Sequence, residues 1–196
     1  MRSGYAALAS LLLLAGCATV PQPRSTLPPA DEQALLLGLT SFALDGRAAV
    51  AANGDGFNAS VAWRQAGTET IVKLSGPIGG SLTLTYRPGF LRVANSRGQV
   101  LQDADAEAAV IEQLGFVPPF EALRYWVLGL PAPGEAPTER IDAAGRIAQL
   151  TQAQWQIRFE RWVPVAAGSG EVQLPQRLTA TREGVRLRVF VDKWRL

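Results

Sequence analysis

An alternation of apolar and polar residues at every second position runs through most of the chain, and it constrains the fold more than any other feature. Such alternation is typical of β-strands that bury one face. It predicts short strands at residues 42–50, 57–63, 71–74, 82–87, 90–94, 147–150, 155–162, 174–181 and 185–191. Gly and Pro residues separate the strands, and Arg87-Pro88-Gly89-Phe90 and Ser96-Arg97-Gly98-Gln99 are typical of hairpin turns. We therefore expect neighbouring strands to pair in antiparallel fashion.

Three stretches follow the spacing of a helix instead. Asp31 can cap a short helix that runs to residue 40. A second helix is expected from Asp103 or Asp105 to residue 114, and Gly115 is suited to end it. A third helix is predicted at residues 120–128, after two prolines that favour a helix start.

The order of these elements favours a mainly β (α+β) fold. Strands precede and follow the helical pair without alternating with helices, so we expect an antiparallel sheet with helices packed on one face. A sheet of this many strands curls. A curled sheet that is closed by helices can enclose an apolar cavity, an arrangement that the pattern permits but does not require.

The N-terminus is typical of a targeting segment. Arg2 precedes an apolar run over residues 6–15, which is shorter than the roughly 20 residues that span a bilayer. The run ends in Leu14-Ala15-Gly16-Cys17, which resembles the lipobox at which bacterial lipoproteins are cleaved and acylated. We expect a signal peptide at residues 1–16, lipid on Cys17, a Pro-rich tether over residues 17–30 and a single domain over residues 31–196. The alternative is an ordinary signal peptide with a chance cysteine.

The absence of histidine excludes most familiar catalytic chemistry. With no His and one Cys, the chain has no Ser-His-Asp or Cys-His catalysis and is unsuited to nearly every zinc site. Carboxylates are the only plausible catalytic groups, but Glu121, Asp142 and Glu160 are scattered along the sequence. The 19 basic and 17 acidic side chains nearly balance, which does not favour nucleic-acid binding by bulk charge. We expect no enzyme activity, no catalytic residue, no metal and no cofactor.

Three features have two interpretations each. The Gly-rich segment at residues 76–81 lacks the Lys-Ser/Thr end of a phosphate-binding loop, so it is either a plain hairpin turn or a loop that exposes Ile78 to a membrane or partner. The five tryptophans either pack the core or line a lipid cavity. The basic face of the strand at 185–191 is either solvated or meets an acidic partner.

Several runs match one known family in place and order. The most specific is Leu123-Arg124-Tyr125-Trp126-Val127-Leu128-Gly129-Leu130-Pro131. Weaker matches are Trp155-Gln156-Ile157-Arg158-Phe159, Leu174-Pro175 with Leu178-Thr179, and the ending at residues 185–194. Together with the lipobox and the loop of Pro77, Ile78 and Gly79, these runs resemble the LolB family of outer-membrane lipoprotein receptors, over the whole mature domain.

The resemblance implies an incomplete, strongly curved antiparallel β-barrel with helices as a lid over an apolar cavity. It also implies a monomer that is lipid-anchored at the periplasmic face of the outer membrane. Such a receptor accepts triacylated lipoproteins from a soluble periplasmic carrier of the LolA type and inserts them into the outer membrane. Ala18 fits an outer-membrane address, since it is not the Asp that resembles an inner-membrane retention signal.

The resemblance also implies site residues. The family's protruding loop carries an apolar residue, usually Leu, and Pro77, Ile78 and Gly79 occupy the matching positions as the membrane-insertion loop. The candidate lining of the acyl cavity is Trp63, Leu123, Trp126, Val127, Leu130 and Trp155. The rival interpretation is a structural or assembly lipoprotein that presents its sheet to a protein partner. A third, a lipid-modifying enzyme, is disfavoured by the missing histidine.

Overall fold

Alternating strands dominate the computed structural model, which describes residues 27–76, 80–168 and 170–196. Within these residues the helices are α1 (Pro29–Leu37), α2 (Asp103–Leu114) and α3 (Phe120–Trp126). The strands are β1 (Ser41–Ala52), β2 (Asp55–Ala66), β3 (Glu69–Ser75), β4 (Ser81–Arg87), β5 (Phe90–Asn95), β6 (Val100–Gln102), β7 (Thr138–Ile141), β8 (Ile147–Gln152), β9 (Trp155–Ala167), β10 (Gly170–Arg182) and β11 (Val185–Arg195). All nine predicted strands are therefore present.

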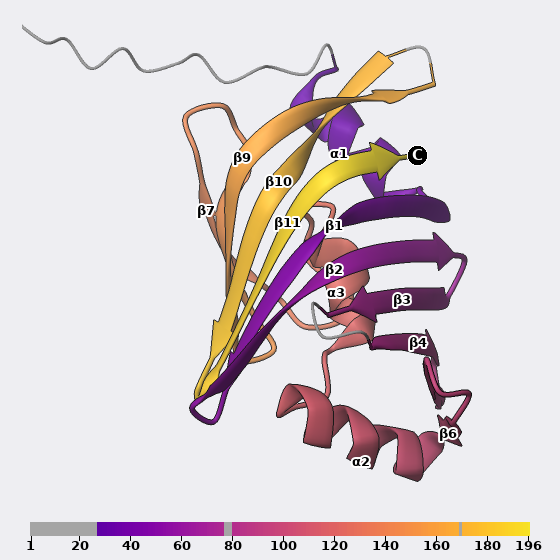
Figure 1. Cartoon of the computed structure of the whole chain (residues 1–196). Coiled ribbons are helices and arrows are strands. Elements are labelled where there is room, and N and C mark those ends of the chain that lie inside the picture. Colours follow the sequence, from indigo (N-terminus) through magenta and orange to yellow (C-terminus); the bar gives the residue numbers. More distant parts are fainter. Residues whose placement is uncertain (1–26, 77–79, 169) are drawn as a thin grey trace, which may run out of the picture.

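The strands form one antiparallel sheet that curves but does not close. Its order is β6-β5-β4-β3-β2-β1-β11-β10-β9-β8-β7, so every neighbour follows its partner in sequence except the central pair β1–β11. In the described part of the chain, β6 and β7 are the two edges of the sheet. The mainly β fold and the incomplete, curved barrel expected from the sequence are thus confirmed (Figure 1).

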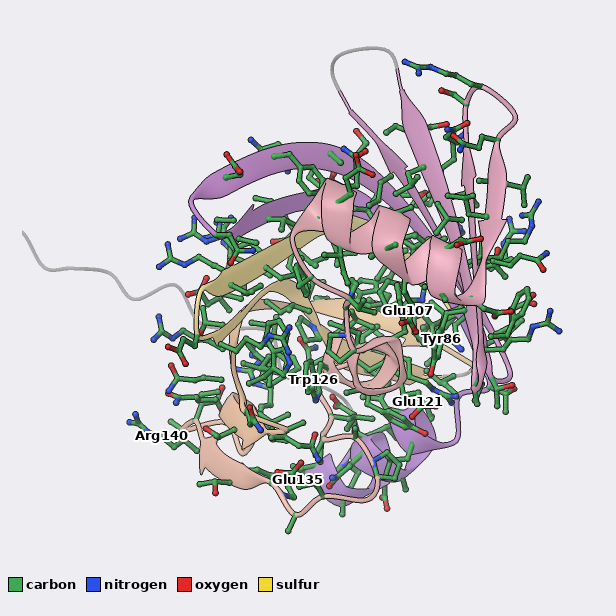
Figure 2. The ribbon with its side chains drawn as sticks, turned by 90° about the horizontal axis from the view of Figure 1, so that it is seen from below. Tyr86, Glu107, Glu121, Trp126, Glu135 and Arg140 are labelled. Atoms are coloured by element: carbon green, nitrogen blue, oxygen red, sulfur yellow. The ribbon has the colours of Figure 1, made fainter. Side chains whose placement is uncertain are left out.

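The three helices lie on the inner side of the curved sheet. Helix α2 lies at one end beside β6, and α1 lies at the opposite end beside the far ends of β9 and β10 (Figure 1). Helix α3 lies between α1 and α2 (Figures 1 and 2). The side chains between the sheet and the helices form one apolar cluster that includes residues from all three helices.

The helix boundaries differ from the prediction in three places, and one is the end of α1, which lies at Leu37 rather than at residue 40. Helix α1 begins at Pro29 rather than Asp31, because Pro is favoured in the first turn of a helix and its ring fixes a helical φ. Asp31 therefore lies inside the first turn and caps nothing. Helix α3 ends at Trp126, two residues before the predicted end. Helix α2 begins at Asp103, and Gly115 ends it with a φ of 81°, as expected.

The alternation of buried and exposed residues in β9 changes at Arg161, which has a φ of 56°. Before this point β9 and β10 bury alternate residues, such as Phe159 opposite Leu178. Beyond it Trp162 is buried, although the alternation of Trp155, Ile157 and Phe159 would place it on the exposed face. β10 extends past its last pair with β11 and lies close to α1, where the Gln173 backbone N–H donates to Glu32 Oε1 at 3.0 Å.

Candidate functional site

The candidate cavity-lining residues meet in the core beneath α3. Trp63, Leu123, Trp126, Val127, Leu130 and Trp155 are all buried and all belong to the same apolar cluster. Trp126 is completely buried, near the centre of the molecule (Figure 2), and its ring centroid lies 6.1 Å from that of Trp155. Phe116 extends this aromatic cluster, at 5.8 Å from Trp155. The structure thus unites residues from β2, β9 and the 123–130 segment.

A buried glutamine joins α3 to the sheet. Gln152, at the end of β8, is 3% exposed, and its Oε1 accepts hydrogen bonds from Trp126 Nε1 at 3.0 Å and from the Ala132 backbone N–H at 2.9 Å. Its Nε2 donates to the backbone carbonyls of Ala132 and Glu135, at 2.8 and 2.7 Å. One side chain therefore positions both the end of α3 and the loop that follows.

A second polar contact holds α3 from the other side. Arg124 Nη1 donates to the Gly67 carbonyl at 3.2 Å, in the hairpin between β2 and β3. That hairpin is itself braced by the buried Gln65, which donates to the same carbonyl at 3.0 Å and accepts from Thr70 at 2.7 Å. Helix α3 therefore rests on an apolar core and is tied to the sheet by a few hydrogen bonds.

Two modest cavities flank the segment of residues 120–130. One, of about 430 Å³, is bordered by Tyr86, Phe120, Tyr125, Pro133 and other residues on the α3 side. The other, of about 390 Å³, lies beneath α1 and is bordered by the 128–130 segment, Trp162 and Ile147. Leu130 is the one predicted lining residue that borders either of these two cavities. The remaining five pack within the closed core.

A third and larger hollow lies on the opposite face of the sheet. It has a volume of about 1280 Å³ and is bordered by outward-facing residues of β1, β2, β9, β10 and β11. Five arginines and one glutamate border it: Arg47, Arg158, Arg177, Arg186, Arg188 and Glu160. Its character is therefore basic, which does not suit an acyl chain.

The carboxylates considered for catalysis are separate structural groups. Burial, together with a hydrogen bond to Glu121, raises the pKa of Tyr86 to about 12; Figure 2 shows these two residues side by side. Burial alone would raise the pKa of Asp142, but hydrogen bonds from Arg146 and Ala144 outweigh it and leave that pKa below its ordinary value. Glu160 pairs with Arg177 at 3.6 Å. Within the described residues, no group of three or more Cys, Asp or Glu side chains is placed to hold a metal ion.

The lipidation residue Cys17 and the membrane-insertion loop of Pro77, Ile78 and Gly79 lie outside the described residues. The same holds for the expected signal peptide and most of the tether. Across the described ranges, no helix is both long and apolar enough to cross a bilayer.

Sequence reasoning missed the polar residues of the interior, which are Gln65, Thr70, Gln152, Gln173 and the partly buried Arg146. Gln152 lies two residues after Leu150 and therefore on the same face of β8. A polar residue at a position where the alternation expects an apolar one was the signal that could have revealed it. Gln173 is buried between Val172 and Leu174, and Arg146 follows a turn with no apolar pattern. Val172, Gln173 and Leu174 are buried in succession, so both faces of β10 are covered here, and no local sequence pattern marks this.

The comparisons by sequence agree on one family. A family model described as "Outer membrane lipoprotein LolB" matches residues 40–194. A protein named outer-membrane lipoprotein LolB from Nitrosococcus oceani is 32% identical, over 96% of this chain and 95% of its own. One of the same name from Alkalilimnicola ehrlichii is 34% identical, over 100% of this chain and 99% of its own. A solved LolA superfamily protein from Nitrosomonas europaea superposes with a TM-score of 0.49 at 11% identity, over 87% of this chain and 94% of its own.

Proposed function

The chain belongs to the LolB family of outer-membrane lipoproteins, and from that membership we propose that it accepts acylated lipoproteins in its interior and delivers them to the outer membrane. It is an outer-membrane lipoprotein receptor on the periplasmic face, and the proposed role is transfer without catalysis. The triacylated form of the cargo and a soluble LolA-type carrier as its donor are part of the proposal, as is action as a monomer.

The physical problem that such a receptor solves is the transfer of acyl chains through water. Each buried methylene is worth about 0.8 kcal/mol, so a lipid with three long chains does not leave a membrane or carrier unaided at a useful rate. An apolar interior can bind the acyl chains and keep them out of water. Transfer then runs from carrier to receptor to bilayer in order of rising affinity, and differential binding suffices to drive it.

The observation that carries the proposal is the placement of the 120–130 segment. It covers an apolar core of aromatic and aliphatic side chains, and a cavity lies on each side of it. Its polar ties to the sheet run mainly through Gln152 and Arg124. We propose that displacement of this segment joins the two cavities over Trp126 and Trp155 and makes room for acyl chains, with Trp63, Leu123, Val127 and Leu130 as further lining.

The anchor and the loop complete the proposal. We propose that residues 1–16 are removed, that Cys17 carries the lipid and that residues 17–30 form the tether. Pro77, Ile78 and Gly79 are proposed as the loop that enters the membrane during delivery. Mass spectrometry of the mature N-terminus tests the anchor, and an unmodified Cys17 thiol would contradict it.

A quenching experiment tests the site of binding. A carrier loaded with a lipoprotein whose acyl chains bear bromine is mixed with the full-length receptor in vesicles, and tryptophan emission is recorded. Bromine quenches nearby indoles, so emission should fall as the cargo is transferred. Trp126→Phe with Trp155→Phe should remove much of the quenching, while cargo with unbrominated chains should cause none.

The outcomes separate the receptor from its rival. Cargo that binds equally with and without acyl chains, and that leaves emission unchanged when brominated, would favour a structural lipoprotein that presents its sheet to a partner. In the same assay, Ile78→Asp should still accept cargo but fail to deliver it to vesicles, because a charge opposes entry into the bilayer. Loss of uptake in that variant would contradict the role proposed for the loop.

A further inference from the structure

The cavity beneath α1 is bordered by both apolar and polar side chains. Its apolar border includes Leu36, Leu128, Leu130, Ile147 and Trp162. Gln173 and Arg146 border it as well. Its volume of about 390 Å³ is near the lower limit of the roughly 300–1,000 Å³ of typical ligand sites, so it suits one part of a larger ligand.

Gln173 is the unusual residue of this cavity. It is 1% exposed, and both polar atoms of its side chain, Oε1 and Nε2, are buried without a protein partner. Its backbone N–H is satisfied by Glu32 Oε1 of α1 at 3.0 Å. The strand register pairs Pro175 with Trp162, so Gln173, two residues from Pro175, shares the face of Trp162. That face borders the cavity, whereas Val172 and Leu174 point the other way.

Arg146 supplies a third buried polar atom without a partner. Its Nε and Nη2 donate to Asp142 Oδ2 at 3.1 and 2.9 Å, and its guanidinium carbon lies 5.1 Å from the centre of the Trp162 ring. Its Nη1 is buried and makes no hydrogen bond to the described protein. Leaving buried polar atoms unpaired is costly, so three of them around one cavity indicate a polar ligand group.

The charges around the cavity exclude an anion as that group. The positive charge of Arg146 is already paired with Asp142 at 2.9 Å. Glu32 and Glu139 also border the cavity and would repel a carboxylate or a phosphate. Gln173 offers one acceptor and one donor, and a neutral secondary amide carries one of each. Because the N–H and the carbonyl of a trans amide point in opposite directions, the N–H can donate to Gln173 Oε1, and the carbonyl then needs a second donor, for which Arg146 Nη1 is the candidate.

We propose that the cavity beneath α1 is a binding site for the secondary amide of an N-acylated cysteine, with the attached acyl chain lying against its apolar border. This inference rests on the proposed function, because it assigns the polar part of the same cargo. A triacylated cysteine carries one chain in amide linkage and two in ester linkage. The site therefore distinguishes the amide-linked chain and fixes the orientation in which the cargo enters.

Two probes that differ in one group test the proposal. N-methyldecanamide and methyl decanoate share chain and shape, but only the amide has an N–H donor. Binding of each to the full-length protein is measured by calorimetry. The wild-type protein should bind the amide about tenfold more tightly, since one net hydrogen bond is worth about that factor. In Gln173→Leu the preference should vanish while ester binding remains.

The control is Gln156→Leu, the same substitution at an exposed position of β9, which should keep the preference. Equal binding of amide and ester to the wild-type protein, or a preference that survives in Gln173→Leu, would overturn the proposal. Failure of the wild-type protein to bind either probe would instead contradict the proposed function itself. Gln173→Leu removes two unpaired polar atoms, so it should fold. If it does not fold, the ratio of amide to ester affinity in the wild-type protein still tests the proposal.

Discussion

At the scale of single residues, three buried glutamines of the interior differ in how their side-chain amides are hydrogen-bonded. Gln152 makes four hydrogen bonds and so fixes the end of α3 against β8. Gln65 makes a similar set with Trp63, Thr70 and the Gly67 carbonyl. Gln173 makes none through its side chain. A satisfied buried amide stabilises the structure, whereas an unsatisfied one is retained at a cost that binding can recover.

Stability measurements on leucine variants distinguish these states. Gln152→Leu should lower the free energy of unfolding by about 2–4 kcal/mol, because it leaves Trp126 Nε1 and backbone groups buried without partners. Gln173→Leu should leave it unchanged or raise it, and the exposed Gln156→Leu should change it little. Urea unfolding followed by tryptophan emission measures all three. A loss in Gln173→Leu as large as that in Gln152→Leu would show that Gln173 is satisfied.

At the scale of elements, the hairpin of β7 and β8 forms one wall of the cavity beneath α1. Its turn is organised by Asp142, whose Oδ1 accepts from the backbone N–H groups of Ala144 and Arg146 at 2.8 and 3.0 Å. Its Oδ2 accepts from the Arg146 guanidinium. These bonds require the carboxylate form, and they hold the pKa of Asp142 below its ordinary value despite burial, which acts to raise it.

The lowered pKa predicts how stability depends on pH. A carboxyl whose pKa is lower in the folded state stabilises that state above its unfolded pKa of about 3.9, and this contribution is lost as the pH falls through the folded pKa. The difference in unfolding free energy between wild type and Asp142→Asn should therefore be largest near pH 7 and shrink towards pH 2. Denaturant unfolding at several pH values measures it, and a constant difference would contradict the pairing with Arg146.

The elements also show what sequence could and could not predict. Long strands such as β1 and β11 were predictable because burial on one face imposes a period of two. Strands β6 and β7 were not, since edge strands of three and four residues with exposed side chains carry no such period. The apolar residues of the candidate site were found through a family motif. Gln173 and Arg146 were not, because tertiary packing rather than local pattern decides their burial.

At the scale of the whole molecule, the pairing of β1 with β11 joins two meandering halves. A bulge at Asp45 and Gly46 interrupts this central pair, and a side chain at Gly46 would collide with the Phe190 carbonyl. Arg195 donates a hydrogen bond to Asp45 at 2.6 Å across the pair and holds the pKa of Asp45 below its ordinary value. The close approach of β1 and β11 at this bulge therefore requires a glycine at position 46.

A methyl group at this position tests that dependence. Gly46→Ala should destabilise the protein by about 2–4 kcal/mol, because backbone must move to admit the Cβ atom. Gly76→Ala is the matched control, since nothing lies within 4 Å of its Cβ position. Thermal unfolding by circular dichroism compares them. Equal melting temperatures for Gly46→Ala and Gly76→Ala would show that β1 and β11 can move apart at this point without loss of stability.

The position of β11 in the sheet also determines the order in which the strands can pair during folding. Asp45 and Arg195 are neighbours in space but 150 positions apart in sequence. A chain that emerges from its N-terminus first can form the β1–β6 hairpins early, yet β1 keeps one open edge until the last residues are free. Closing so long a loop is slow, and the exposed edge invites aggregation meanwhile. The final eleven-residue strand therefore decides when the two halves become one domain, and the chain needs protection until that strand arrives.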